Sequence, residues 1–433
     1  MGTGQVLRAQ DEAFRATRAA GFSRDVVVIG GCGRVGLPLA IALAERGALV
    51  GVHDRDGTAV DLVNAGLLPF REPGAADVLA RVVAAGRLRA DADPGIISSA
   101  ETVVVAVGTP IDEHLNPDPA AIPEALRTDI AHFRDGQLVV LRSTVFPGVT
   151  ALVEKTFTAH TLAVDTACCP ERSAEGRAMT ELFALPQLLG GCTPRAAERA
   201  TRLFRLLTKQ IVNVTPEEAE VAKLFANAWR YIKFAAANQF YMMAHDRGLD
   251  FERLRAALAL DYPRAADLPG AGFTAGPCLL KDTMQLMALA DNNFTLGASA
   301  MQVNEGLPLH LASRLERAYD LAKLKVGILG MAFKGESDDI RSSLAYKLKR
   351  VLAFKAAAVL CTDPYVRTDP GLRPLDEVLE EADILIIAAP HAAYRDLHTR
   401  KPVVDIWNLR LDTASLRPTA VQRLPIDTSS HFH

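Results

Sequence analysis

The chain has 433 residues, of which 49% are hydrophobic and 23% are charged, and its formal net charge is −3. A chain of this length is too long to fold around a single hydrophobic core, so we expect several domains. The near-neutral balance and the lack of a long apolar run argue against nucleic-acid and membrane partners. Residues 1–24 carry scattered charges without an apolar core, which is not the pattern of a signal peptide. We therefore expect a cytoplasmic protein with an N-terminal extension.

A strand, a glycine turn and a helix follow one another after this extension. The β-branched run 26–29 leads into GCGRVG, and an apolar-periodic helix continues to Gly47. The glycines let backbone N–H groups approach a pyrophosphate, and the acid that ends the next strand accepts hydrogen bonds from a ribose. This combination predicts NAD as the cofactor. The predicted NAD contacts here are Gly31, Gly33, Arg34, Val35, Gly36 and Asp54.

Two further apolar runs, 102–110 and 137–148, are typical of strands buried in a parallel sheet. Both end in Gly, Thr and Pro. Because ligands of doubly wound folds bind beyond the carboxyl ends of strands, Thr109 and Thr144 are candidate contacts to cofactor or substrate. The alternative interpretation is that both threonines only cap their strands.

The segment from Thr215 to Gly248 predicts one long helix. It has a Thr N-cap, acids in its first turn and a terminal glycine. Lys223 and Asn227 are four residues apart, so they share a helix face and are candidates to point together into a cleft. A solvated lysine beside an incidental asparagine is the alternative.

Cys278 stands out among six cysteines, which lie at positions 32, 168, 169, 192, 278 and 361. Their spacing fits neither a metal site nor a disulfide scaffold, so we expect a reduced protein without a metal. Cys278 lies in GFTAGPCLLKD, a glycine-rich loop suited to presenting a sulfur.

Strand and turn patterns resume at residue 325. KVGILGMAFK, AAVLCTDPY, DILIIAAP and VVDIW predict four strands, without a complete G-x-G-x-x-G. We therefore expect a second nucleotide-type domain that holds a different ligand, with Lys334 and Arg341 as candidate phosphate or base contacts. Pairing of Arg341 with the acids of GESDDIRSS is the alternative.

These motifs together resemble the UDP-glucose/GDP-mannose dehydrogenase family. The resemblance runs from Val26 to about Trp407 and rests on GCGRVGLPLA, LPFREPG, VAVGTP, STVFPG, PERSAEG, EVAKLFANA, GFTAGPCLLKDT and GMAFKGESDDIR. It implies an α/β fold with two Rossmann-like doubly wound domains joined by a long central helix. We expect an NAD domain at 25–214, a central region with the cysteine loop at 215–322, and a sugar-nucleotide domain at 323–433.

The resemblance also implies a reaction. It is a four-electron oxidation of the C6 alcohol of a UDP-hexose to a uronate with two NAD, through a thiohemiacetal and a thioester on Cys278. Lys223 and Asn227 would stabilise an oxyanion, and Asp282 and Thr144 would position water. The further residues that the resemblance assigns are Glu171 and Glu175 for catalysis, Lys281 for the cofactor, and Glu171, Lys223, Asn227, Arg264, Phe273, Gly276, Lys334 and Arg341 for the substrate.

The substrate and assembly expectations follow from the same resemblance. UDP-glucose is favoured, with UDP-N-acetylglucosamine or UDP-N-acetylmannosamine as alternatives, because PERSAEG is typical of enzymes for N-acetylhexosamine nucleotides. A homodimer with Arg264 near the subunit interface is expected. A two-electron hydroxyacid-type dehydrogenase and a non-catalytic nucleotide sensor remain as functions of other classes.

Overall fold

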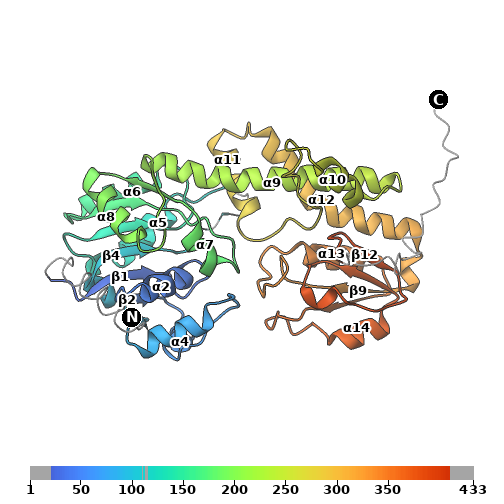
Figure 1. The fold of residues 1–433 in the computed structure, drawn as a ribbon, viewed down its shortest axis with the longest axis horizontal. Coiled ribbons are helices and arrows are strands. Elements are labelled where there is room, and N and C mark those ends of the chain that lie inside the picture. The colour runs from blue at the N-terminus through green and yellow to red at the C-terminus, as the bar shows by residue number, and fades with distance from the viewer. Residues whose placement is uncertain (1–20, 110, 113–115, 410–433) are drawn as a thin grey trace. The chain divides into compact units, whose positions relative to one another are not determined.

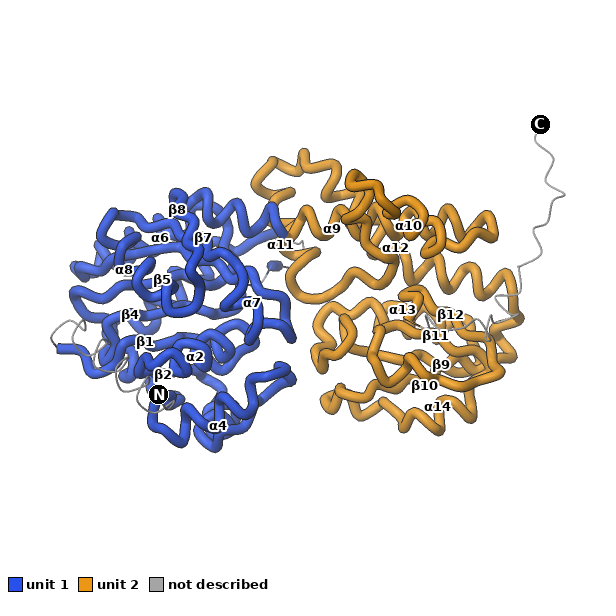
Figure 2. Tube along the Cα trace, viewed as in Figure 1, with its two compact units in different colours: residues 1–226 blue, residues 227–433 orange. Residues whose placement is uncertain are grey.

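The computed structural model describes residues 21–109, 111–112 and 116–409. The chain divides into two compact units, of which unit 1 ends at Ala226 and unit 2 begins at Asn227 (Figure 2). Residues 1–20 of the predicted extension lie outside the described residues.

The sheet of unit 1 has the strand order β3-β2-β1-β4-β5-β6-β7-β8 in the described residues, and its neighbouring strands are parallel except β6 and β7. Its first six strands follow the order of a dinucleotide-binding fold. The strands are β1 Arg24–Ile29, β2 Val50–His53, β3 Leu88–Asp91, β4 Ala100–Val105, β5 Leu138–Leu141, β6 Asp165–Cys168, β7 Gln187–Gly191 and β8 Ile211–Asn213.

Helices cover this sheet on both faces, which explains its apolar strands (Figure 1). In β1, Val26 and Val28 belong to one hydrophobic core, and Val27 and Ile29 belong to the other. The helices are α2 Gly36–Glu45, α3 Gly57–Asn64, α4 Ala76–Ala84, α5 Ala121–Thr128, α6 Val149–Ala159, α7 Ala178–Ala184 and α8 Pro194–Phe204, with 3₁₀ turns at η1 Pro94–Ser99 and η2 Ile130–His132.

Unit 2 contains a second parallel sheet, with the order β10-β9-β11-β12 in its described part. Its strands are β9 Lys325–Leu329, β10 Ala358–Thr362, β11 Ile384–Ile387 and β12 Val403–Asp405. Its remaining elements are α10 Phe251–Ala259, α11 Leu279–Leu289, α12 Thr295–Ala318, η3 Leu321–Lys323, α13 Leu344–Ala353, α14 Leu375–Glu381 and η4 Ala392–Tyr394.

Helix α9, Pro216–Asp246, is the long helix that the sequence predicts. It begins with a capping box, because Thr215 Oγ1 accepts from the Glu218 N–H and Glu218 Oε2 accepts from the Thr215 N–H, at 3.2 and 2.7 Å. The predicted fold class is thereby confirmed. None of the described helices combines the length and apolarity that crossing a membrane requires.

Two predicted strands are shorter than their apolar runs. β4 ends at Val105, and β5 ends at Leu141, so the Gly-Thr and Ser-Thr segments beyond them lie outside the sheet. Pro110, the end of the first predicted run, lies outside the described residues. The loops beyond these strands are therefore available to carry function.

A pair of histidines between α9 and α12 makes the stability of unit 2 dependent on pH. Burial, Arg314 and His310 lower the pKa of His245 to about 4, and its Nδ1 has no hydrogen-bond partner among the described residues. Between pH 6.5 and 4 the unfolded histidine therefore binds more protons than the folded one, so the free energy of unfolding falls as the pH falls.

We expect the His245→Gln variant to lose less stability than the wild type over this interval, by up to ~2 kcal/mol, since partial solvent exposure screens part of the linkage. Urea unfolding at pH 6.5 and at pH 4.5 measures the difference. Parallel stability losses in both proteins would show that His245 already charges in the folded state.

Candidate active site

The turn after β1 forms a cradle of glycines at the N-terminus of α2. A Cβ on Gly31 would lie 2.6 Å from Val28 O, and one on Gly36 would lie 2.7 Å from Gly30 O, so both positions require glycine. Gly33 is exposed, and the helix begins after Val35, which has no capping side chain. Backbone N–H groups at such a helix start suit a pyrophosphate.

Asp54 stands beside this turn at the end of β2. Its Oδ2 accepts from the Cys32 N–H at 3.0 Å, and its Oδ1 accepts from the Asp56 N–H at 3.1 Å. The carboxylate oxygens keep further acceptor capacity, as a ribose contact requires. Arg55 lies 3.8 Å from Asp129 Oδ2. The cradle and the acid together fit a dinucleotide.

Thr109 and Thr144 are brought together beyond the carboxyl ends of β4 and β5. The Thr109 hydroxyl donates to Thr144 O at 2.7 Å. The neighbouring Ser143 hydroxyl donates to Val107 O, also at 2.7 Å. These bonds tie the two loops at the sheet edge where doubly wound folds bind ligands.

Glu171 is held by a buried arginine that sequence reasoning missed. Arg142 Nε and Nη2 donate to Glu171 Oε2 at 3.1 and 2.5 Å, and its Nη1 donates to Gln187 Oε1 at 2.6 Å. Burial raises the pKa of Glu171, but Arg142, hydrogen bonds from Ser173 and the charge of Lys223 outweigh it and lower that pKa. Glu171 is therefore ionised and anchors its loop.

The rest of the PERSAEG loop is held from two sides. Glu175 Oε1 accepts from Arg34 Nη1 at 3.2 Å, so a predicted catalytic acid pairs with a predicted cofactor contact. The buried Glu72, within LPFREPG, accepts from the N–H groups of Gly176 and Ala178, both at 2.9 Å. The carboxylate of Glu72 thus fixes the end of the loop.

Asn227 and Asp282 form a buried pair in unit 2. Asn227 Nδ2 donates to Asp282 Oδ2 at 2.5 Å, and Lys281 Nζ lies 3.1 Å from Asp282 Oδ1. Lys223 lies one turn before Asn227 on α9. The amide and the carboxylate hold each other in place, which orients both polar groups.

The cysteine loop packs on the C-terminal sheet region of unit 2. A Cβ on Gly276, whose φ is +100°, would lie 2.6 Å from the Phe333 ring, and one on Gly272 would overlap the Trp407 ring. Gly276 N donates to Ser342 O at 3.4 Å. Glycine at 276 therefore allows the loop to lie against the segment that carries Lys334 and Arg341, and glycine at 272 allows it to lie against Trp407.

Cys278 is the exposed member of the six cysteines, all of which lie in the described part of the chain. It occupies the N-cap position of α11, and Asp282 follows one turn later, fully buried. The helix N-terminus favours a negatively charged group such as a thiolate.

The remaining predicted substrate contacts differ in their surroundings. Phe273 is buried in the hydrophobic core of unit 2, and Arg341 is bound by Asp339 through two nitrogens while its side chain stays 57% exposed. Lys334 Nζ lies 5.7 Å from the centre of the Phe333 ring. Arg264 lies over the Tyr262 ring at 5.5 Å, after α10. Within the described residues, no cluster of side chains suits a metal ion.

Comparison with protein families covers most of the chain. Residues 24–208 match the NAD binding domain of the UDP-glucose/GDP-mannose dehydrogenase family, residues 217–306 match its central domain, and residues 327–411 match its UDP binding domain. The first match includes the glycine cradle and Asp54, and it identifies NAD as the cofactor.

Individual relatives are similar over nearly their whole length. UDP-N-acetyl-D-mannosamine dehydrogenase of Pyrococcus horikoshii is 31% identical over 86% of this chain and 91% of its own. NDP-N-acetyl-D-galactosaminuronic acid dehydrogenase of Ralstonia nicotianae is 30% identical over 88% and 94%. Among solved structures, a UDP-glucose dehydrogenase from Pyrobaculum islandicum is 28% identical with a TM-score of 0.82, over 89% and 95%.

Proposed function

Because the chain belongs to the UDP-glucose/GDP-mannose dehydrogenase family, we propose that it oxidises the C6 hydroxyl of a UDP-hexose to a carboxylate. The observation that carries the proposal is Cys278, exposed at the start of α11 and one turn from the buried Asn227–Asp282 pair. A dehydrogenase that stops at a two-electron step has no use for a thiol placed in this way.

Cys278 gives the enzyme its covalent step. Its thiolate adds to the carbonyl carbon of the C6 aldehyde and forms a C–S bond. Loss of hydride from C6 then gives a thioester, and addition of water breaks the C–S bond, releasing the carboxylate and the thiol. Two NAD molecules, bound in turn at the glycine cradle, would accept the two hydrides: one from C6 of the alcohol, whose hydroxyl also loses its proton to give the aldehyde, and one from C6 of the thiohemiacetal.

The polar residues of each unit have matching tasks in this proposal. In unit 2, the Asn227 amide stabilises negative charge on the C6 oxygen, and Asp282 accepts a proton from the attacking water. In unit 1, Lys223 adds a cation, while Thr144 and Glu175 order water. Glu171 supports the substrate through its loop rather than through proton transfer, since Arg142 and backbone N–H groups already occupy its oxygens.

We favour a UDP-N-acetylhexosamine as the substrate, with UDP-N-acetylmannosamine first. The Pyrococcus and Ralstonia relatives act by name on N-acetylated sugars, and so does the UDP-N-acetyl-D-mannosamine dehydrogenase of Escherichia coli, which is 30% identical over 84% of this chain. UDP-glucose, which the sequence favours, is the second candidate because of the Pyrobaculum structure.

We also propose a homodimer. Apolar side chains on α9 and α10 and in the loops after them are exposed, a surface that suits a second copy of the chain. Arg264 follows this surface in sequence and is the proposed contact near the subunit interface. The exposed side chains are Phe240, Met243, Leu249, Leu254, Leu258, Leu260 and Tyr262.

The test is the NADH yield per sugar on a panel of UDP-N-acetylmannosamine, UDP-N-acetylglucosamine, UDP-glucose, UDP-galactose and GDP-mannose. Two NADH per molecule on one UDP-sugar is the expected result. One NADH would indicate the two-electron hydroxyacid-type reaction, and NAD binding without turnover on any sugar would indicate a sensor.

A further inference from the structure

Asp363 follows β10 and is the centre of a buried polar cluster in unit 2. Its Oδ2 accepts from the N–H groups of Met331 and Ala332 at 2.7 and 2.9 Å. Its Oδ1 accepts from the N–H groups of Tyr365 and Val366 at 2.8 and 3.1 Å. Four backbone donors thus converge on one carboxylate, two from the turn after β9 and two from the loop after β10.

His391 is the second member of this cluster and links Asp363 to Glu336, which lies further along the turn after β9. The ring is fully buried, its Nε2 lies 3.1 Å from Asp363 Oδ2, and its Nδ1 accepts from the Glu336 N–H at 3.0 Å. A backbone N–H directed at Nδ1 requires a lone pair there, so Nε2 carries the proton and donates to Asp363. The neutral imidazole therefore bridges Asp363 and Glu336.

The residues around Glu336 are held closely by the segment 390–392. Glu336 has a positive φ of 58°, and its Oε1 accepts from the Ala392 N–H at 2.8 Å. Its Oε2 accepts from the Tyr365 hydroxyl at 2.8 Å. A Cβ on Gly335 would lie 2.5 Å from Pro390 O, so this approach requires glycine. The turn has little freedom on this side.

Lys334 lies between the two anchored points of the turn. Ala332 is two residues before it and is held by Asp363, while Glu336 is two residues after it and is held by His391. A lysine has a flexible stem, so a fixed backbone lowers the entropy lost when its ammonium group binds a phosphate. The Asp363–His391 pair controls that backbone from both sides.

The corresponding acid of unit 1 clarifies this role. Asp54 and Asp363 each follow the strand next to the one that carries the glycine turn. Asp54 accepts from two backbone N–H groups, whereas Asp363 accepts from four and from His391 as well. The second acid has its acceptor capacity committed to the protein, so it holds a turn where the first is available to a ribose.

We propose that Asp363 and His391 are positioning residues for the UDP part of the substrate, acting through Lys334. This inference rests on the proposed function, because it assigns the turn to a UDP-sugar. Neither side chain needs to touch the ligand. The pair sets the affinity for the nucleotide rather than the rate of the chemical step.

The decisive experiment measures binding of UDP alone to the full-length protein by calorimetry. His391→Ala removes both bonds of the ring, and we expect the Kd for UDP to rise ~10- to 100-fold. The KM for the UDP-sugar should rise in parallel, while kcat at saturation and the Kd for NAD change less than about twofold. His391→Asn keeps an acceptor for Glu336, and His391→Gln keeps a donor for Asp363, so both should be intermediate.

A double-mutant cycle with Lys334→Ala separates positioning from general damage. If His391 acts through Lys334, then His391→Ala weakens UDP binding by less than about threefold when Lys334 is already alanine. The proposal is overturned if His391→Ala still raises the Kd for UDP by the full ~10- to 100-fold when Lys334 is already alanine. It is also overturned if the three His391 variants bind UDP with wild-type affinity. A wild-type protein that binds no UDP contradicts the proposed function itself.

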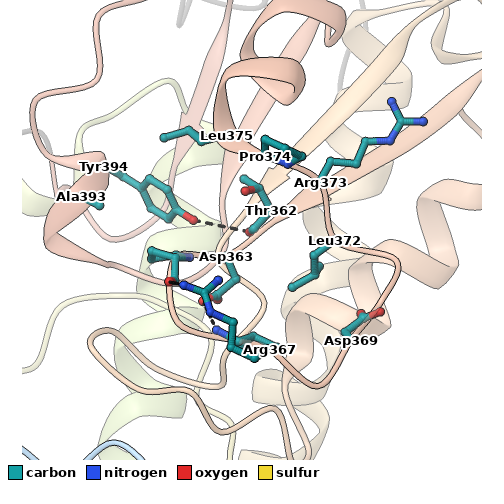
Figure 3. Close-up of a pocket in the computed structure, with 12 residues that line it drawn as sticks. Thr362, Asp363, Arg367, Asp369, Leu372, Arg373, Pro374, Leu375, Ala393 and Tyr394 are labelled. Carbon is teal, nitrogen blue, oxygen red and sulfur yellow. Dashed lines mark hydrogen bonds between the residues drawn. The ribbon is translucent and has the colours of Figure 1, made fainter.

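A cavity of about 500 Å³ beside Asp363 supplies the control (Figure 3). Asp363, Arg373 and Tyr394 line it, and Figure 3 shows the Arg373 guanidinium directed away from Asp363. Arg373 Nη1 donates to Glu381 Oε1 at 3.0 Å. Arg373→Ala should therefore leave the Kd for UDP unchanged, and a matching loss in this variant would mean that the whole region, rather than the pair, responds.

Discussion

Replacing Cys278 with serine is expected to abolish uronate formation, with kcat falling by about 10⁴-fold or more. The thiolate is the attacking species in the proposed covalent step, and a serine hydroxyl at neutral pH is a far weaker nucleophile. The product is measured by mass spectrometry after a fixed time. Rapid acid quenching of the wild type should also trap a sugar adduct on the peptide that contains Cys278.

Cys192→Ser is the matched control for this variant. Cys192 is only partly exposed, and burial, Glu154 and Glu220 raise its pKa to about 12, so it remains a thiol at neutral pH. Its loss should leave uronate formation within about twofold of the wild type. Normal turnover by Cys278→Ser, or an adduct on another cysteine, would eliminate the thioester route.

Replacing Arg142 with methionine should cost about 3–5 kcal/mol of stability, because the Glu171 carboxylate then stays largely buried without its cation. Arg142 is 2% exposed and also donates to Cys169 O and Gln187 Oε1, so further acceptors lose their donor. Urea unfolding at pH 7, followed by circular dichroism, measures the free energy of unfolding.

Arg195→Met tests whether the loss of stability in Arg142→Met arises because that ion pair is buried. Arg195 pairs with the buried Asp165 at 2.9 Å, but its own side chain is 73% exposed, and Arg199 remains to neutralise the acid. This variant should lose far less stability than Arg142→Met. Similar losses in both variants would show that the Arg142–Glu171 pair is no stronger than a surface ion pair.

Much of the fold was accessible from local sequence. The β-branched runs, the glycine turn after β1 and the capped start of α9 each carry their signal within a few residues, so strands and helices are predictable there. The positions at which strands end were less predictable. An apolar run continues past Val105, but the hydrogen bonds that end β4 are decided by the neighbouring strands.

The residue pairs that hold the candidate site in place could not be predicted from local sequence. Arg142 and Glu171 are 29 residues apart, and Asp363 and His391 are 28 apart, so neither pair leaves a local pattern. Phe273 shows the same limit, since its place in the core of unit 2 depends on residues of the C-terminal sheet that are distant in sequence, while its substrate contact stays a prediction. The predicted domain boundaries and individual catalytic roles stay predictions.

The uninterrupted α9 limits how this chain can vary in length. The boundary between the two units falls after Ala226, inside the helix, and Lys223 and Asn227 stand on either side of it. Inserting one residue between them would turn the Asn227 amide by about 100° around the helix axis relative to Lys223. Natural variants and engineered chimaeras can exchange residues here, but gaps and insertions are acceptable only where they preserve helical phase.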